Sequence, residues 1–326
     1  MGSTKDHIND MTYNVKDEFS LNLDKIIDSE YEKAFEILDK YVARYIKNEY
    51  GIDNYKMPEL VILEDNSLLI GTYLPISNSF VGRYVPALNQ IIFSKNFIER
   101  FVNSQLKFLG YKRGIEEIMN RRLKFLGYKE IKVSISDAQD IGYLYIKRNL
   151  LFLYPSYIND RNKKESIAEF IVRLATFHEG LHLFDYMILH KLAENSIIEY
   201  INYSDNISNN GELRATASEV VMDFLASGLY KDERVYIPVY SNIPICRTYI
   251  EKLDILEKNK NTKEYVPYDL GFCYGNIIVA KYGPSLKENI QDIIKYIVHL
   301  NKERAIDEIK RYGDNLKDNL KRRLYG

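Results

Sequence analysis

Apolar side chains recur at every third or fourth position over residues 167–192 of the chain. This spacing places them on one face of a helix. The stripe consists of Ile167, Phe170, Ile171, Leu174, Phe177, Leu181, Phe184, Ile188 and Leu192. A second buried helix is predicted from Glu212 to about Gly228. The segment 202–211 between them is rich in Asn and Ser, and it is predicted to be a loop.

Further helices are predicted on both sides of this part of the chain. Ser29-x-x-Glu32 forms a capping box, apolar positions follow at helical spacing, and Gly51 is a typical helix stop. Residues 1–28 before this helix are predicted to be a loose leader. The C-terminal region is predicted to be mainly helical and to end in an amphipathic Lys/Arg-rich helix over 302–323. We expect breaks at its prolines, which are Pro238, Pro244, Pro267 and Pro284.

The pattern between residues 57 and 165 is that of short strands. Strands are predicted at 59–63, 82–85 and 89–93, and the last two form a hairpin. Residues 141–158 align without gaps on 81–98 and predict a second, similar hairpin. The two hairpins are an internal duplication, two layers of one sheet, or a coincidence between hairpins of a common type.

These patterns predict an α+β fold. A small mixed or antiparallel sheet is expected to pack on the two buried helices, with a mainly helical C-terminal region. The expected divisions are a leader with a packing helix, an α/β region with two similar hairpin units, the two buried helices, and the helical C-terminal region. Their boundaries are 1–55, 56–165, 166–232 and 233–326.

The composition is that of a folded protein, with 46% hydrophobic and 28% charged residues. The net charge of −1 gives no whole-chain attraction to nucleic acid or to an anionic membrane. Residues 100–132 differ, because they carry nine Lys or Arg against three Glu. Such a face can meet phosphate, but most basic runs are solvated helix surface, so nucleic-acid contact is not favoured.

Cysteine usage and targeting signals bear on the compartment. Cys246 and Cys273 cannot make a disulfide framework and lack the spacing of a thiolate metal site, so we expect buried thiols. The first 28 residues contain no apolar core of a secretory signal. No run reaches the roughly 18 apolar residues of a membrane span. We therefore expect a cytoplasmic protein without membrane contact.

The sequence His178-Glu179-Gly180-Leu181-His182 lies inside the first buried helix. Side chains four residues apart share one face of a helix, so His178 and His182 can bind one metal ion together. Glu179 projects beside them, where a general base for a metal-activated water is expected. The chain has only five histidines, so a chance occurrence of this spacing is uncommon.

A third protein ligand is needed, because a catalytic zinc takes three and leaves the fourth position to water. A carboxylate from the following helix is the natural source, and Glu212 and Glu219 share one face of it. We prefer Glu219, because Asp223 one turn later could bind the free ring nitrogen of a ligand histidine. Glu212 remains the alternative. Asp185 could anchor a ligand histidine or make a contact at the edge of the core.

These residues resemble the gluzincin metallopeptidases, which combine His-Glu-x-x-His with a glutamate from the next helix. His178, Glu179 and His182 match that motif. Ser218-Glu219-x-x-x-Asp223-Phe224 is similar to the ligand stretch of thermolysin-like members. The resemblance implies a zincin-like fold, in which the sheet packs on the motif helix and on a ligand-bearing helix. It also implies Zn²⁺ as the cofactor and a peptide or protein as the substrate.

The resemblance leaves the third ligand open and has departures. Glu212-Leu-Arg-Ala215 fits the Glu-x-x-Ala of small gluzincins as well as Glu219 fits the longer pattern. The segment from Tyr268 to Gly271, followed by Lys281-Tyr282-Gly283, is similar to a helical segment found after the active site in several members. Gly180 inside the motif and Ser218, where asparagine is usual, depart from the family pattern.

The resemblance implies an endopeptidase in which Glu179 takes a proton from water and passes it to the leaving amine. An additional hydroxyl often helps to hold the oxyanion, and Tyr268 and Tyr274 are candidates. The alternative is a non-enzymatic or regulatory zincin-fold protein that binds a partner or nucleic acid through the basic segment 100–132.

Overall fold

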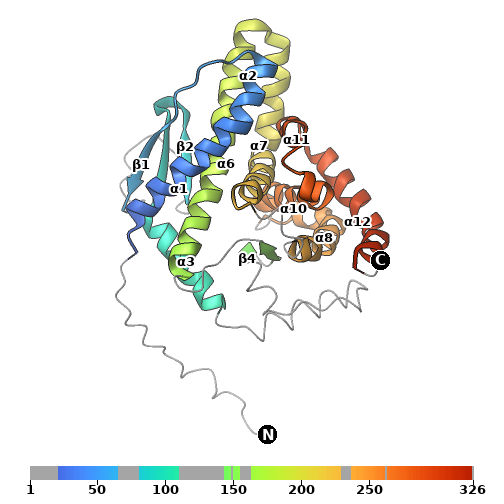
Figure 1. Ribbon diagram of the computed structural model, residues 1–326. Coiled ribbons are helices and arrows are strands. Elements are labelled where there is room, and N and C mark those ends of the chain that lie inside the picture. Colours follow the sequence, from blue (N-terminus) through green and yellow to red (C-terminus); the bar gives the residue numbers. More distant parts are fainter. Residues whose placement is uncertain are drawn as a thin grey trace.

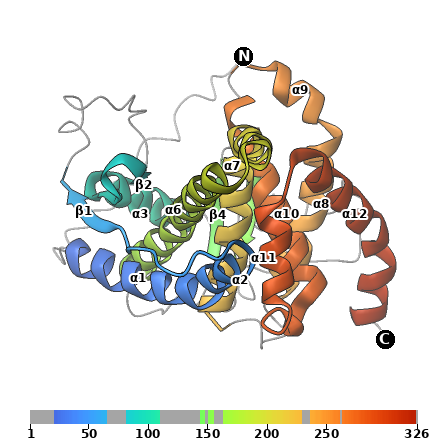
Figure 2. The same ribbon diagram turned by 90° about the horizontal axis from the view of Figure 1, so that it is seen from above.

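Two long helices form a hairpin at the centre of the computed structural model, α6 (Lys163–Asn195) and α7 (Ile197–Ala226). The structure describes residues 21–64, 81–109, 143–147, 150–154, 163–228, 236–260 and 263–324. A small sheet lies on one side of the hairpin, and the C-terminal helices lie on the other (Figures 1 and 2). The described residues are mostly helical with a three-stranded mixed sheet, which confirms the α+β class at this coarse level.

Helix α1 (Leu23–Leu38) begins earlier than the capping box at Ser29 predicted. Asn22 is its N-cap, and the Asn22 side chain accepts a hydrogen bond from the Lys25 N–H at 3.2 Å. Three apolar residues after this cap extend the buried face of the helix, namely Leu23, Ile26 and Ile27. Ser29 therefore lies inside α1, because the buried stripe continues on its N-terminal side.

The N-terminal helical region continues to the glycine that the sequence predicted as its stop. A π-helical turn (Asp39–Ala43) connects α1 to α2 (Arg44–Tyr50). Gly51 follows with a φ of 67°, a left-handed conformation that glycine adopts without steric cost. The helix stop at Gly51 is confirmed.

The three-stranded sheet has the order β1-β3-β2. Strand β1 (Glu59–Leu63) is parallel to β3 (Gln90–Ser94), and β2 (Gly82–Val85) is antiparallel to β3. A 3₁₀ turn (Pro86–Leu88) and Asn89, whose φ is 49°, connect β2 to β3. The predicted strands are confirmed, and β2 lies at an edge of the described sheet, against α6.

The second predicted hairpin is also present, as β4 (Tyr143–Lys147) and β5 (Leu150–Tyr154). These strands form their own two-stranded sheet, so in the described residues the two hairpins are not layers of one sheet. Helix α3 (Lys95–Leu109) follows β3 and contacts α6. The strand next to the motif helix is therefore β2 of the first hairpin.

Helix α7 includes residues 202–211, so the predicted loop is wrong. Tyr203 is buried within this stretch, and its hydroxyl donates a hydrogen bond to Asp185 of α6 at 2.9 Å. Asn209 and Asn210 donate side-chain hydrogen bonds to carbonyl groups four residues earlier, at 2.8 and 3.2 Å. Packing against α6 thus outweighs the turn preference of Asn and Ser, whose side chains bond within the helix.

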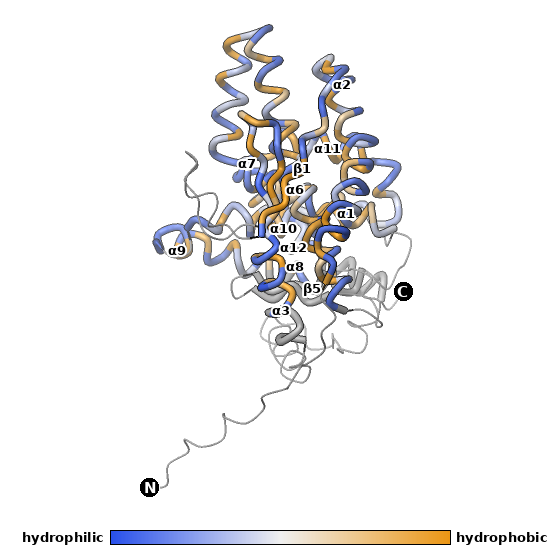
Figure 3. Tube along the Cα trace, turned by 90° about the vertical axis from the view of Figure 1, so that its left-hand side faces the viewer, coloured by the Kyte–Doolittle hydropathy of each residue, from blue (hydrophilic) through white to orange (hydrophobic). Residues whose placement is uncertain are grey.

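The far end of the hairpin projects beyond the other elements, and hydrophobic and hydrophilic segments alternate along it (Figure 3). At the start of α7, Ile197, Ile198 and Ile201 are 65%, 69% and 50% exposed. None of the helices in the described part of the chain combines the length and the apolar character that crossing a membrane requires.

The C-terminal region is mainly helical, as predicted. It contains α8 (Tyr236–Glu251), α9 (Leu253–Lys258), a 3₁₀ turn (Lys263–Tyr265), α10 (Val266–Tyr282), a second 3₁₀ turn (Gly283–Ser285), α11 (Ile290–Val298) and α12 (Lys302–Leu324). The breaks at Pro267 and Pro284 are confirmed, since α10 begins and ends beside them. The break at Pro244 is wrong, because α8 continues through it. Pro238 lies in the first turn, where no helical N–H is needed.

Cys246 of α8 and Cys273 of α10 form a disulfide, with 5.4 Å between their Cα atoms. Both residues are fully buried. The two cysteines are buried, as expected, but they are not free thiols. The packing of α8 on α10 brings them together although they are distant in the sequence. Disulfides are rare in reducing compartments, so this bond does not favour the expected cytoplasmic location.

Helix α10 packs closely on α7 through two glycines. A Cβ atom at Gly271 would meet the backbone oxygen of Leu213 and would lie 2.8 Å from Cβ of Thr216. A Cβ atom at Gly275 would lie 2.6 Å from Cβ of Val220. Backbone and Cβ atoms cannot rotate away, so these glycines fix the distance between the two helices.

We expect Gly271→Ala to lower the free energy of unfolding by about 1–3 kcal/mol, because the added methyl group overpacks the contact with α7. Alanine is otherwise the better helix former by about 0.5–1 kcal/mol. Gly313→Ala is the matched control, since a Cβ there would meet the flexible side chain of Arg247, whose Cδ is 3.3 Å away. Urea denaturation of both variants measures the difference, and equal stabilities would contradict the close packing.

Candidate metal centre

Helices α6 and α7 bring three candidate metal-binding side chains together. The rings of His178 and His182 lie one turn apart on α6, with 5.0 Å between their centroids. Glu212 of α7 faces both, because its Oε2 lies 3.0 Å from Nε2 of His178 and 3.8 Å from Nε2 of His182. One nitrogen or oxygen atom from each of the three residues lies within 4.8 Å of the others.

This group could hold a metal ion. The ligand atoms of a tetrahedral zinc site lie about 3.3 Å from one another, because zinc bonds to nitrogen and oxygen are about 2.0–2.1 Å long. The distances of 3.0 and 3.8 Å from Glu212 to the two rings lie on either side of that value. Two of the three separations are therefore close to those of a tetrahedral site, and the third is within 4.8 Å. Two imidazoles and one carboxylate suit zinc and also other divalent transition ions.

Glu219, the third ligand preferred from the sequence, lies at the other nitrogen of the His178 ring. Its Oε2 is 3.1 Å from Nδ1 of His178. Glu212 and Glu219 are seven residues apart, which is about 10 Å along a helix, so they reach the ring from opposite ends. The structure thus places Glu212, the alternative, beside both histidines. It places Glu219 where a carboxylate orients a ligand histidine.

The two carboxylates stabilise a proton on His178. Burial lowers the pKa of this histidine, but the hydrogen bonds to Glu212 and Glu219 outweigh it and raise the pKa to about 10. Burial also opposes the charge of Glu212, yet its hydrogen bonds to His178 and His182 bring its pKa below the ordinary value. A metal ion and a proton compete for Nε2 of His178, so metal binding would release a proton.

Glu179 lies next to this group and contacts the sheet. The backbone N–H of Tyr84 in β2 donates a hydrogen bond to Oε2 of Glu179 at 2.7 Å. Burial raises the pKa of the Glu179 carboxyl, and the neighbouring histidines and this hydrogen bond offset part of the rise. A carboxylate with a raised pKa is a better proton acceptor, as a general base requires.

The packing of α1 on α6 explains why a glycine, Gly180, occurs inside the motif. A Cβ atom at this position would collide with the side chain of Leu38, which comes from α1. The absence of a side chain lets α1 lie close to α6 beside the metal-binding residues. The departure from the family pattern is therefore explained by the position of α1.

The two predicted tyrosines lie in different surroundings. The ring of Tyr268 stacks on His178, with 6.0 Å between the centroids and 9° between the planes. Tyr274 is buried on the same helix, α10, and its electrostatic neighbours include Arg304 and Glu308 of α12. The structure therefore brings Tyr268 to the candidate site and directs Tyr274 toward α12.

Asp185 is buried in an ion pair with Arg214 of α7. Its Oδ1 also accepts the hydrogen bond from the Tyr203 hydroxyl, and Arg214 donates to the same hydroxyl at 2.9 Å. Of the two roles predicted for Asp185, the contact within the core is the one that the structure shows. The pair connects the turn after His182 to α7.

Asp223 does not contact a ligand histidine, so that prediction is wrong. Its Oδ1 accepts a hydrogen bond from Nε of Arg173 on α6 at 2.6 Å. Arg173 also donates to Glu30 of α1 at 2.7 Å, so one guanidinium joins three helices. The ring contact expected for Asp223 is made by Glu219, one turn earlier on α7.

Several of these residues were missed from the sequence. Glu30 and Arg173 interrupt apolar stripes, and a charged residue within a buried stripe is a signal for a buried ion pair. Arg214 gives a similar signal beside the buried Leu213 and Ala215. The role of Tyr84 has no such signal, because its backbone makes the contact.

Known proteins do not assign this site. No protein-family model matches the chain. No curated protein matches it, and no solved structure does. The resemblance to gluzincins therefore depends on the residues described above and stays a prediction. The basic segment 100–132 lies mostly outside the described residues, which end at 109 in that part of the chain.

We expect Glu212→Ala to weaken Zn²⁺ binding more than Glu219→Ala does. The first substitution removes one of the three candidate ligands, whereas the second removes a hydrogen bond that would orient His178, which is worth about 10–100-fold in affinity. Titration against a chromogenic chelator gives the dissociation constants. Glu194→Ala, which removes an exposed carboxylate further along α6, is the control and should change little. The reverse order would restore Glu219 as the ligand.

We expect Arg214→Leu to destabilise the fold by about 3–5 kcal/mol, because it leaves the Asp185 carboxylate buried without its cation. The double variant Asp185→Leu with Arg214→Leu should recover much of this loss, since no unpaired charge remains. Thermal or urea unfolding of both single variants and the double variant measures the coupling. Additive losses would mean that the ion pair does not determine the stability of this region.

Proposed function

We propose that the chain is a zinc-dependent endopeptidase that hydrolyses peptide bonds. His178, His182 and Glu212 would hold the metal, and Glu179 would act as the general base. One observation carries the proposal. Two imidazoles and a carboxylate, the donor set of many catalytic zinc sites, converge from two adjacent helices with a second carboxylate beside them.

Bound zinc would supply Lewis acidity toward water and toward a substrate carbonyl. The part of the protein itself is proton transfer through Glu179. The Tyr84 N–H holds one carboxylate oxygen of Glu179, and the other can accept a proton from water and later donate it to the leaving amine. The raised pKa of this carboxyl suits both steps.

The edge of the sheet supports a peptide as the substrate. Strand β2 pairs with β3 on one side, and the N–H of Tyr84 is directed to Glu179 instead of β3. An extended peptide can add to such a strand edge through main-chain hydrogen bonds. A peptide in this position would pass directly beside the Glu179 carboxylate. Tyr268, stacked on His178, is the proposed donor to the oxyanion.

Glu179→Gln tests the proposal. The variant should bind Zn²⁺ with unchanged affinity, because Glu179 is not among the ligands. Its kcat/KM on peptides should fall by about 10²–10⁴-fold, the usual contribution of a general base. Zinc analysis of the purified protein and mass spectrometry of a digested peptide mixture provide the two measurements.

A chain that binds no zinc, or a Glu179→Gln variant that cleaves as fast as the unmodified chain, would contradict the proposal. Zinc binding without peptide cleavage by the unmodified chain would instead favour the non-enzymatic alternative. Glu199→Gln is the matched control, since it removes an exposed carboxylate from α7 of the same hairpin, away from the candidate metal centre, and should leave the rate unchanged.

A further inference from the structure

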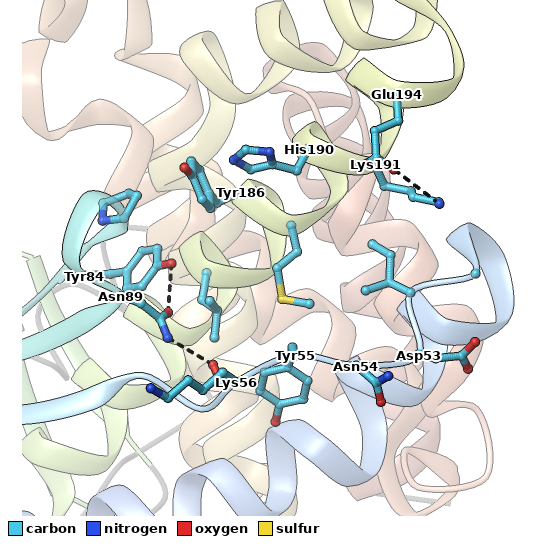
Figure 4. Close-up of a pocket in the computed structure, with 15 residues that line it drawn as sticks. Asp53, Asn54, Tyr55, Lys56, Tyr84, Asn89, Tyr186, His190, Lys191 and Glu194 are labelled. Atoms are coloured by element: carbon cyan, nitrogen blue, oxygen red, sulfur yellow. Dashed lines mark hydrogen bonds and ion pairs between the residues drawn. The ribbon is translucent and has the colours of Figure 1, made fainter.

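A pocket of about 460 Å³ lies along α6, beyond the candidate metal centre. Leu183 and Met187 of α6 line it, together with Tyr84 of β2 and Tyr55 of the segment between α2 and β1. Figure 4 shows Tyr186 and His190 contributed by α6 on one side and Tyr55 by that segment on the other. The volume is within the range of ordinary ligand sites and exceeds that of one side chain.

The pocket lies along the same face of α6 as Glu179. Leu183 and Met187 follow Glu179 at intervals of four residues, so all three lie on one stripe of α6. Tyr84 connects the pocket to Glu179, because it lines the pocket and its backbone N–H donates a hydrogen bond to Glu179. The pocket therefore begins one helical turn, about 5 Å, beyond the proposed general base and reaches at least a second turn.

The lining favours a neutral, aromatic occupant. Tyr55, Tyr84 and Tyr186 supply aromatic walls, and the thioether of Met187 packs well against rings. Tyr186 is 36% exposed and meets His190 edge to face, with 4.6 Å between the ring centroids. A partly exposed aromatic pair at the mouth of a pocket can pack on a further ring.

Charges in the lining are largely paired already. The pocket has four Asp, Glu or Lys side chains in its lining, and three of them are in ion pairs. Lys191 lies 3.5 Å from Glu194, and Asp53 lies 2.9 Å from Lys47. A charged ligand would have to compete with these partners, whereas an uncharged ring would not.

We propose that this pocket is the specificity subsite of the proposed peptidase and binds an aromatic side chain of the peptide substrate. The inference rests on the proposed function, because the substrate must lie along β2 and Glu179. An extended peptide advances about 3.3 Å per residue, and the part of the pocket at Leu183 and Tyr186 lies about 6–11 Å from Glu179 along α6. That part would receive roughly the second or third residue from the cleaved bond.

Digestion of a random peptide mixture by the zinc-loaded chain tests the inference, with the cleaved products identified by mass spectrometry. Phe and Tyr should be enriched at the second or third residue on one side of the cleaved bond. A matched pair of peptides, with Phe or Ala at that residue, then gives a kcat/KM ratio. Tyr186→Ala should lower this ratio about tenfold, the scale of discrimination by an apolar pocket, while the Ala peptide is cleaved as before.

Tyr200→Ala is the matched control, because Tyr200 lies on α7 of the same hairpin and does not line the pocket. It should leave the ratio unchanged. Cleavage without aromatic enrichment, or an unchanged ratio in Tyr186→Ala, would overturn the subsite while the proposed function stands.

If the unmodified chain cleaves no peptide, the proposed function fails and the subsite is judged by binding alone. Fluorescence anisotropy of the same two labelled peptides then decides. Tighter binding of the Phe peptide that is lost in Tyr186→Ala would support the subsite. Equal binding of both peptides, or none, would overturn it.

Discussion

The fold depends on charged side chains that are buried between α6 and α7 in matched pairs. Arg173 meets Asp223, His178 meets Glu219, and Asp185 meets Arg214. The partners follow opposite orders along the two helices, as an antiparallel hairpin requires. Removing one member of a buried pair is strongly destabilising, so a shift of one helix by a turn would separate all three pairs at once. These pairs therefore fix the register of the hairpin.

The candidate metal centre takes its geometry from this register. The contact between His178 and Glu219 is the middle pair, and it leaves Nε2 of the ring directed to Glu212. Close approaches at Gly180 and Gly271 hold α1 against α6 and α10 against α7. The positions of the candidate ligand atoms thus follow from packing that involves four helices, to which His178 itself contributes one of the three pairs.

Local periodicity was sufficient to predict α6, the place of the motif on it and the strands near residues 59–93. It failed where tertiary contacts decide. The Asn-rich stretch before Glu212 is helical because Tyr203 reaches Asp185, and no window of sequence contains both partners. Whether Glu212 or Glu219 is the candidate third ligand depends on which ring nitrogen of His178 each carboxylate contacts. The rotation of the His178 ring decides this, and helical spacing does not determine that rotation. The disulfide depends similarly on the packing of α8 against α10.

The contacts of the candidate site differ greatly in sequence separation. His178 and Glu212 are 34 residues apart within one helical hairpin, whereas Glu179 and Tyr84 are 95 residues apart. Closing a short loop costs less chain entropy than closing a long one, so local contacts form first during folding. A chain in which only the α6–α7 hairpin has assembled already brings its metal-binding residues together. Docking of the sheet then adds the contact between Tyr84 and Glu179, so the candidate metal-binding group would assemble before Glu179 is oriented.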